Sequence, residues 1–274
     1  MNVLHIGPKN YPPSHGGVEK SVFDIINNIK NINSYIAVEW NQEYHPKVVI
    51  LPKKFFSRIQ ILMSFCSNKK IDILHFNKET FIPLALFFNF FTNYKVLISI
   101  RGCAWRLKRW PRLIRSIFYI LDLLACLSIK HVVFVSKTDW SHFTRIFFWK
   151  KLYFIPNGIT EHNHISSSAN YKLVYLGRIS PEKNIINMIK LFANRKESLT
   201  IYGPFDKHDP TYTKDVIKLI DSYNNINYGG VISYDKIFQT LSMYSGFVSL
   251  SLSEGMPVAV LEAASVGLNL ILSD

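Results

Sequence analysis

Short hydrophobic runs alternate with longer amphipathic segments along the whole chain. The short runs are rich in Val, Ile and Leu and have the length of buried strands, whereas the longer segments repeat apolar residues at helical spacing. The predicted strands are Asn2–Gly7, Tyr35–Glu39, Val48–Leu51, Ile71–Phe76, Val96–Ile100, His131–Val135, Lys151–Ile155, Lys172–Leu176, Leu199–Tyr202, Ile226–Tyr228, Gly246–Leu250 and Asn269–Leu272. The predicted helices are Val18–Ile29, Phe55–Ser67, the Phe-rich run within Thr80–Tyr94, Leu113–Ile129, a segment after Ser136, Ile185–Phe192, Tyr212–Tyr223, Lys236–Met243 and Ala259–Val266. This alternation predicts an α/β fold with parallel sheets.

The alternation is interrupted once, after the strand Lys151–Ile155. Pro156 and Gly158 break the pattern, and residues 161–170 are polar, with three serines and two histidines. We therefore predict two doubly wound, Rossmann-like domains. They are an N-terminal domain of residues 1–160 and a C-terminal domain of residues 171–274, joined by a linker at residues 161–170.

A loop with two prolines and two adjacent glycines follows the first strand and precedes the first helix. Gly16 and Gly17 allow the backbone to approach a ligand without a Cβ in the way. The same composition also fits an ordinary turn. The dinucleotide fingerprint G-x-G-x-x-G is absent, which argues against a nicotinamide-dependent oxidoreductase.

Charged residues in the second half of the chain predict an anion and sugar site. Arg178 and Lys183 follow a strand and lie beside a predicted helix N-terminus, where free N–H groups already favour an anion. Glu254 precedes a Gly-Met-Pro turn, and Glu262 lies about two turns further along a helix that Pro257 can begin. Two cations for a diphosphate and two carboxylates for sugar hydroxyls indicate a nucleotide-sugar site. Either segment alone also fits a solvated helix start with ordinary surface charges.

These segments resemble the donor-binding half of the GT-B retaining glycosyltransferases that carry the Glu-x7-Glu motif (family 4, or group 1). Pro12–Glu19 resembles the glycine loop of that family, and Ile155–Ile159 resembles its hinge signature. The resemblance implies two Rossmann-like domains that face each other across a cleft. It also implies transfer of a hexose-type sugar from a nucleoside diphosphate sugar to a saccharide or lipid-linked acceptor, with retention, in bacterial-type surface polysaccharide synthesis. No metal ion or other cofactor is expected.

The resemblance assigns roles to residues on the donor side. Arg178, Lys183 and Glu254 are the expected catalytic residues, because the two cations would neutralise the leaving diphosphate and Glu254 would hold the donor sugar. Glu262 would hold the ribose. The expected donor-binding residues are Gly16, Gly17, Gly177, Gly203, Gly255, Met256, Pro257 and Glu262.

His75 and Arg101 are candidates for the acceptor side. Each lies at or near the C-terminal end of a predicted strand, where open α/β sheets bind ligands. Many family members have a His-Gly pair where this chain has Arg101-Gly102. An arginine there suits an acidic acceptor or a phosphate, although a strand-end arginine in solvent fits equally well. A lone histidine such as His75 is more often structural than catalytic.

The net charge of +13 predicts acidic partners. No nucleic-acid-binding signature accompanies the charge, so nucleic acid is not expected. The basic segment Arg101–Arg115 contains two tryptophans and leads into the apolar segment Leu113–Leu127, which suits an anionic membrane surface. A solvated basic loop that caps a core helix is the alternative. The apolar runs Thr80–Tyr94 and Leu113–Ile129 are predicted to be buried helices rather than membrane spans.

The three cysteines lie far apart and have no metal-binding spacing, so reduced thiols in a cytoplasmic protein are expected, with peripheral attachment at the inner face of the membrane as an option. The chain stops at Asp274, whereas the resembling family runs on for further elements. We therefore expect the second domain to be incomplete. This leaves a second hypothesis, a catalytically inactive remnant that acts as a basic, membrane-associated binding protein.

Overall fold

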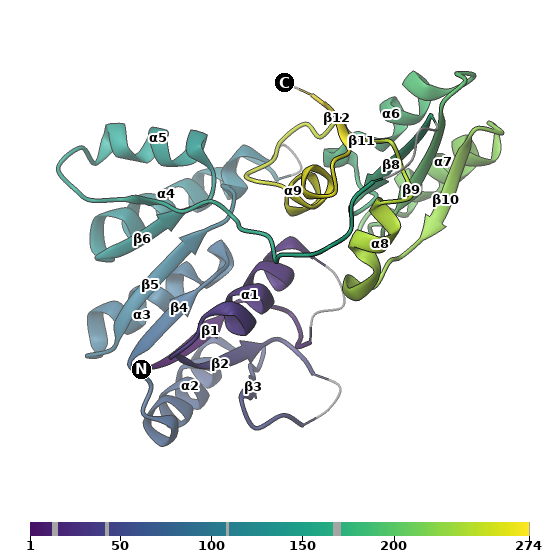
Figure 1. Cartoon of the computed structure of the whole chain (residues 1–274). Helices are drawn as coiled ribbons and strands as arrows, with labels where there is room; N and C mark the ends of the chain where they lie inside the picture. Colours follow the sequence, from purple (N-terminus) through teal and green to yellow (C-terminus); the bar gives the residue numbers. More distant parts are fainter. Residues whose placement is uncertain (13–15, 42–43, 108–109, 167–170, 274) are drawn as a thin grey trace. The chain divides into compact units, whose positions relative to one another are not determined.

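The chain forms two compact units, each with its own parallel sheet. The structure is a computed structural model that describes residues 1–12, 16–41, 44–107, 110–166 and 171–273. The units are Met1–Asn157 and Gly158–Asp274, called here the N-terminal and C-terminal units. Figure 1 shows the elements of both. The prediction of two doubly wound α/β units is confirmed.

The N-terminal unit is built on a seven-stranded parallel sheet with the strand order β3-β2-β1-β4-β5-β6-β7. Its strands are β1 (Asn2–Ile6), β2 (Asn33–Val38), β3 (Val48–Ile50), β4 (Ile73–Phe76), β5 (Lys95–Ile100), β6 (His131–Phe134) and β7 (Tyr153–Phe154). Its helices are α1 (Gly17–Asn28), α2 (Phe55–Lys69), α3 (Ile82–Phe91), α4 (Arg112–Ser128) and α5 (Lys137–Ile146), with short 3-10 turns η1 (Glu79–Phe81) and η2 (Ala104–Arg106).

Side-chain alternation along the strands gives this sheet two apolar faces. Val22 of α1 packs against Ile36 and Val38 on one face. The larger core on the other face joins the strands to α2, α3, α4 and α5 through residues such as Leu4, Leu62, Phe76, Phe88, Cys126 and Phe143. The order of the strands reverses between β1 and β4. In open α/β sheets, ligands bind outside the carboxyl ends of the strands at such a switch point.

The C-terminal unit has a five-stranded parallel sheet with the order β10-β9-β8-β11-β12. Its strands are β8 (Lys172–Leu176), β9 (Ser198–Tyr202), β10 (Ile226–Gly230), β11 (Gly246–Ser249) and β12 (Asn269–Leu272). Its helices are α6 (Ile185–Phe192), α7 (Pro210–Asp221), α8 (Ile237–Leu241) and α9 (Val258–Ser265), with 3-10 turns η3 (Pro181–Lys183) and η4 (Tyr234–Lys236). The switch point of this sheet lies between β8 and β11.

One helix differs from its prediction. The segment Leu113–Ile129 was expected to be buried, and α4 does form there, but one side of α4 carries exposed leucines and isoleucines. The opposite side, with Ala125 and Cys126, packs into the core. Among the described residues, no helix is both long enough and apolar enough to cross a membrane.

Candidate functional site

The turns after β8 and β11 meet at the switch point of the C-terminal unit. The turn after β8 carries Gly177 and Arg178 and leads into η3, which ends at Lys183. The loop after β11 carries Glu254. The Leu252 amide donates a hydrogen bond of 2.8 Å to the Glu182 carbonyl, so this loop is docked on η3. The fold therefore places the three predicted catalytic side chains on two neighbouring loops.

A direct ion pair joins two of these residues. Lys183 Nζ donates to Glu254 Oε1, across 71 positions of the sequence. Both side chains are about one quarter exposed, at 24% and 27%. An ammonium carries three donors, so the contact with Glu254 leaves two for a further acceptor. Glu254 thus holds the Lys183 ammonium in place without using its full hydrogen-bonding capacity.

Arg178 is the more exposed cation. Half of its side chain is accessible to solvent, at 51%, and its Nη1 lies 4.0 Å from Asp206 Oδ2. The backbone at Arg178 is held in place, because the Tyr175 hydroxyl donates a hydrogen bond of 3.0 Å to the Arg178 carbonyl. Burial raises the pKa of the Tyr175 phenol well above its ordinary value, and the charge of Glu254 adds to this rise in pKa. Tyr175 is therefore a neutral, buried support for the turn that presents Arg178.

Two glycines make the strand ends fit together. The Gly203 amide donates to the Gly230 carbonyl at 2.8 Å, and the Gly177 amide donates to the Tyr202 carbonyl at 3.0 Å. A Cβ at Gly203, where φ is +136°, would lie 1.9 Å from the Gly177 carbonyl oxygen. A Cβ at Gly177 would lie 2.7 Å from the Tyr175 hydroxyl. Close backbone approach therefore requires glycine at position 203, and the buried Tyr175 side chain requires it at position 177.

Glu262 occupies a different setting from Glu254. Helix α9 begins at Val258, with Pro257 at its N-cap, so Glu262 is only about one turn from the helix start. Glu254, with Gly255 and Met256, lies in the loop outside the helix. The predicted spacing of two helical turns between the glutamates is therefore wrong. The Glu262 side chain is buried, with 2% of the residue exposed.

In the N-terminal unit, Arg101 lies directly after β5 and is held by neutral groups. Its Nη1 donates to Ser21 Oγ at 2.6 Å and to Asn157 Oδ1 at 3.1 Å, and its Nη2 donates to Asn77 Oδ1 at 2.9 Å. No carboxylate lies within ion-pair distance of it in the described part of the chain. Burial lowers the pKa of Arg101 to about 10, so the guanidinium remains charged at neutral pH. It is a half-buried cation whose described hydrogen-bond partners are neutral, while the charge of Glu19 acts on it from further away and opposes the fall in its pKa.

His75 lies on β4, which pairs with β5, the strand that Arg101 follows. Its Nδ1 is 3.1 Å from His5 Nδ1, and its Nε2 is 2.8 Å from Ser99 Oγ. Burial, followed by the nearby charge of Arg101, lowers the pKa of His5 to about 4, and burial also lowers the pKa of His75 well below its ordinary value. Both rings are therefore neutral at pH 7. The sequence analysis did not identify His5 and Ser99. Side chains alternate between the two faces of a strand, and this pattern on the neighbouring strands could have indicated that both residues share a sheet face with His75.

Gly16 is the N-cap of α1, with φ of +110°, and a Cβ there would meet the Glu19 carboxylate. Gly17 is the first residue of α1. The rest of the expected glycine loop, Pro13–His15, lies outside the described residues, as do Lys108 and Arg109 of the expected basic segment.

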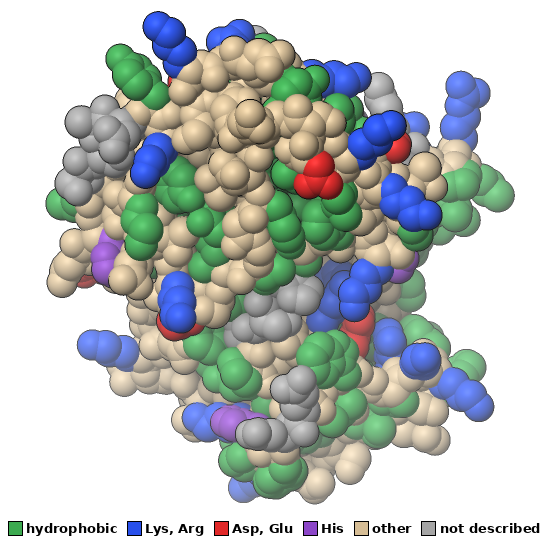
Figure 2. Space-filling model, turned by 90° about the vertical axis from the view of Figure 1, so that its right-hand side faces the viewer, with side chains coloured by type: hydrophobic (Ala, Val, Ile, Leu, Met, Phe, Trp, Pro, Cys, Tyr) green, Lys and Arg blue, Asp and Glu red, His purple; other side chains and the backbone are tan. Residues whose placement is uncertain are grey.

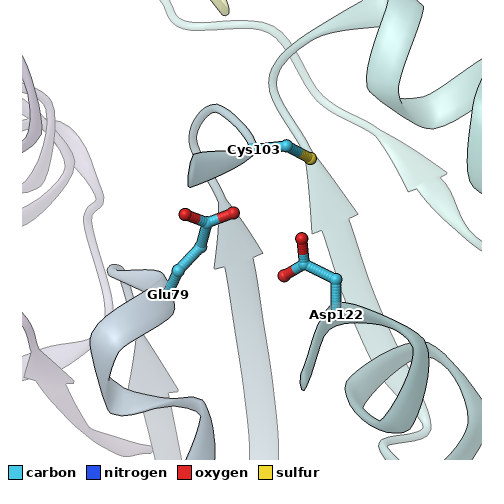
Figure 3. Close-up of side chains that lie close together, drawn as sticks. All are labelled: Glu79, Cys103 and Asp122. Carbon is cyan, nitrogen blue, oxygen red and sulfur yellow. The ribbon is translucent and has the colours of Figure 1, made fainter. Parts of the chain in front are cut away.

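One cluster could hold a metal ion by its composition. The ligand atoms of Glu79, Cys103 and Asp122 lie within 4.8 Å of one another, and Figure 3 shows these side chains turned toward a common point. Both Glu79 oxygens accept the Ala104 amide, at 3.0 and 2.8 Å. Burial raises the pKa of both carboxyl groups and of the thiol. Metal binding needs deprotonated ligands, so the cluster fits a buried, protonated acid pair better than a metal site.

Comparisons with known proteins bear on the family and the fold. The family model described as "Glycosyl transferases group 1" matches residues 160–274. A search of curated protein sequences finds no match. Among solved structures, HepE of Anabaena in complex with UDP and glucose has a TM-score of 0.76 at 14% identity, covering 98% of this chain and 80% of that one.

Two further structures show the same likeness. Sucrose-phosphate synthase of Thermosynechococcus elongatus has a TM-score of 0.78 at 13% identity, covering 99% of this chain and 81% of that one. WaaG, a glycosyltransferase involved in lipopolysaccharide biosynthesis, has a TM-score of 0.70 at 12% identity, covering 98% and 80%. The match to the group 1 glycosyl transferase model covers residues 160–274, and the fold of the chain is that of the GT-B glycosyltransferases.

Proposed function

We propose that this protein is a glycosyltransferase that uses a nucleoside diphosphate sugar as its donor and transfers the sugar with retention. The observation that carries the proposal is the Lys183–Glu254 ion pair beside Arg178 at the switch point of the C-terminal unit. Several solved structures of this fold contain UDP, including HepE with UDP-glucose and the O-GlcNAc transferase GtfA with UDP and GlcNAc. We therefore place uridine first among the candidate bases.

The proposed roles follow from charge and position. In the reaction, the bond between the sugar C1 and the diphosphate oxygen breaks, and an acceptor hydroxyl forms the new bond to C1 and releases its proton. Negative charge then grows on the departing diphosphate. Lys183 and Arg178 stabilise that charge from fixed positions, which lowers the barrier without reorganisation. Glu254 accepts hydrogen bonds from sugar hydroxyls with the carboxylate oxygen that Lys183 does not occupy, and Glu262 is assigned to the ribose.

No metal ion has a step in this proposal, because the two cations perform the neutralisation. The acceptor is proposed to be a saccharide or a lipid-linked saccharide, in surface polysaccharide synthesis at the cytoplasmic side of a membrane. In the N-terminal unit, the charge of Arg101 suits an acidic or phosphorylated group on that acceptor, because the described hydrogen-bond partners of its guanidinium are all neutral groups.

Release of nucleoside diphosphate from UDP-sugars tests the proposal. Arg178→Ala and Lys183→Ala are expected to lower kcat/KM at least roughly a hundredfold each, since each removes a charge-assisted contact to the leaving group. Lys190→Ala is the matched control, because Lys190 is an exposed lysine in the last turn of the neighbouring α6. Equal turnover in all three variants would refute the assignment. A chain that binds and turns over no donor would favour the alternative of an inactive, membrane-associated binding protein.

A further inference from the structure

The outer side of α4 is a continuous apolar stripe. Its members recur at helical spacing and are each between 41% and 74% exposed: Leu113, Ile117, Ile120, Leu124 and Leu127. The stripe runs for roughly 21 Å along the helix axis. The solvent-facing positions of a surface helix in a globular protein are usually polar. The face therefore has the pattern of a helix that lies against another apolar phase.

Exposed aromatic rings lie on two segments that are hydrogen-bonded to the C-terminal end of α4. Lys150 Nζ donates to the Leu127 carbonyl at 2.9 Å, which places the adjacent Phe148 and Trp149 beside the last turn of the helix. Those two rings are 82% and 64% exposed. Asn89 of α3 reaches the Ser128 carbonyl at 3.4 Å and brings the exposed Phe90 and Phe91 to the same end. We call these four rings and the stripe the α4 surface.

The chain segment that contains α4 is strongly basic. Segment 101–157 contains eleven lysines and arginines and only two acidic residues, Asp122 and Asp139, both of which are buried. Arg112 begins α4, Lys130 follows it, and both are exposed. Figure 2 draws the side on the right of Figure 1, which is not the side where α4 is labelled; lysine and arginine side chains are spread over that side too, with few acidic side chains among them.

Three described residues of the basic segment before and at the start of α4 make contacts within the fold. Arg106 is engaged with Asp139 at 2.7 Å, and Arg115 donates to the Trp105 carbonyl at 2.6 Å. The Trp105 ring packs between Tyr119 and His142, with centroid distances of 5.1 and 5.4 Å. Trp105, Arg106 and Arg115, which belong to the segment that the sequence assigned to a membrane contact, thus support the fold, whereas Arg112 and the outer side of α4 are exposed.

We propose that the α4 surface docks on an anionic lipid bilayer, with α4 lying in the plane of the interface. Interfacial helices bury an apolar face at the headgroup boundary while cationic groups at its rim bind anionic lipids. Exposed tryptophan and phenylalanine favour the same depth. The inference deepens the membrane part of the proposed function, but it does not depend on the nucleotide site.

A second copy of the chain is a poorer occupant. In a symmetric dimer the same patch faces itself, so the cationic rims of both copies would meet with no exposed acid of segment 101–157 to neutralise them. An anionic bilayer satisfies both the apolar stripe and the cationic rim.

Sedimentation of the full chain with vesicles tests the proposal. Phosphatidylcholine vesicles that contain phosphatidylglycerol are expected to bind the protein, more strongly at low salt than at high salt. Ile120→Asn/Leu124→Asn should lower the partition coefficient roughly tenfold. Arg112→Ser/Lys130→Ser should lower it by a similar factor on anionic vesicles only.

Leu191→Asn/Ile217→Asn is the matched control, because it removes two aliphatic side chains of similar exposure, 44% and 42%, from the C-terminal unit. It should bind vesicles like the wild type. Equal binding by the control and the α4 variant would overturn the proposal, as would a wild-type dimer that Ile120→Asn/Leu124→Asn converts to a monomer. Melting temperature and UDP binding, measured on every variant, separate a failure of this proposal from loss of the fold or of the donor site.

Discussion

Protonation of the buried histidine pair should destabilise the N-terminal unit, and the size of the effect follows from its geometry. The Nδ1 atoms of His5 and His75 lie 3.1 Å apart. A hydrogen bond between these two atoms needs one donor and one acceptor. If both rings were protonated, two N–H donors and two positive charges would point at each other. The Arg101 charge and burial oppose protonation further.

The sign follows from proton binding. The pKa of His5 is lowered from 6.5 to about 4 in the folded chain, so between these values the unfolded state binds more protons. The contribution of His5 to stability is therefore present above pH 6.5 and lost as the pH falls toward 4. One unit of pKa corresponds to about 1.4 kcal/mol, which makes the loss roughly 3 kcal/mol. The pKa of His75 is lowered as well, so it adds to the loss.

Tryptophan fluorescence reports this unit alone, because all five tryptophans of the chain lie within Met1–Asn157. We propose urea unfolding between pH 4 and pH 7.5 for the wild type and for His5→Leu/His75→Leu. The readout is the difference in unfolding free energy between the two proteins, since Glu79 and Asp122 titrate with the opposite sign in the same range. The unfolding free energy of the variant, relative to that of the wild type, should rise by about 3 kcal/mol or more from pH 7 to pH 4.

A difference that stays constant with pH would show that the histidines titrate normally. They would then be accessible to solvent, and His75 would regain its place as a candidate for acceptor chemistry.

Three further predictions follow from other contacts. Asp122→Asn should gain stability relative to the wild type as the pH rises from about 4 to about 7, because burial raises the pKa of Asp122 and the contribution of the protonated acid is lost over that range; the same fluorescence assay measures it, and a flat difference would contradict it. Gly203→Ala should destabilise the C-terminal unit by about 3 kcal/mol, since its Cβ would overlap the Gly177 carbonyl; thermal unfolding by circular dichroism checks this, and an unchanged melting temperature would refute the close approach. Glu254→Gln should lower sugar transfer by at least roughly tenfold while UDP affinity changes little, because it keeps a hydrogen-bond acceptor beside Lys183 but removes a carboxylate from the sugar; calorimetry and turnover together test the split.

The sequence located the elements well because apolar periodicity and turn residues are local signals. Strand β8 and helix α6 have the predicted bounds, and Ser136 caps α5 by accepting the Asp139 amide at 3.3 Å. The fold was predicted correctly for the same reason, since the glycine turns and charged residues fall at fixed positions after strands, and the family model matches the segment 160–274 that carries most of them.

Contacts between distant segments could not be predicted in this way. The pairing of Lys183 with Glu254 depends on β8 and β11 being neighbours, which is a property of the sheet order rather than of either segment. The exposed side of α4 was also missed, because an apolar helix has the same composition whether its outer face meets protein, lipid or water. For His75, strand position alone suggested a ligand, whereas the structure gives both ring nitrogens protein partners.

Binding of nucleoside diphosphates to the purified chain tests the central claim most directly. A thermal-shift series with UDP, GDP, TDP and ADP should show a selective rise in melting temperature with one diphosphate, and UDP is the expected one. The rise should disappear in Lys183→Ala and persist in Lys190→Ala. A chain that melts cooperatively but shifts with none of the four, or that shifts equally in both variants, would contradict a donor site at the ends of β8 and β11.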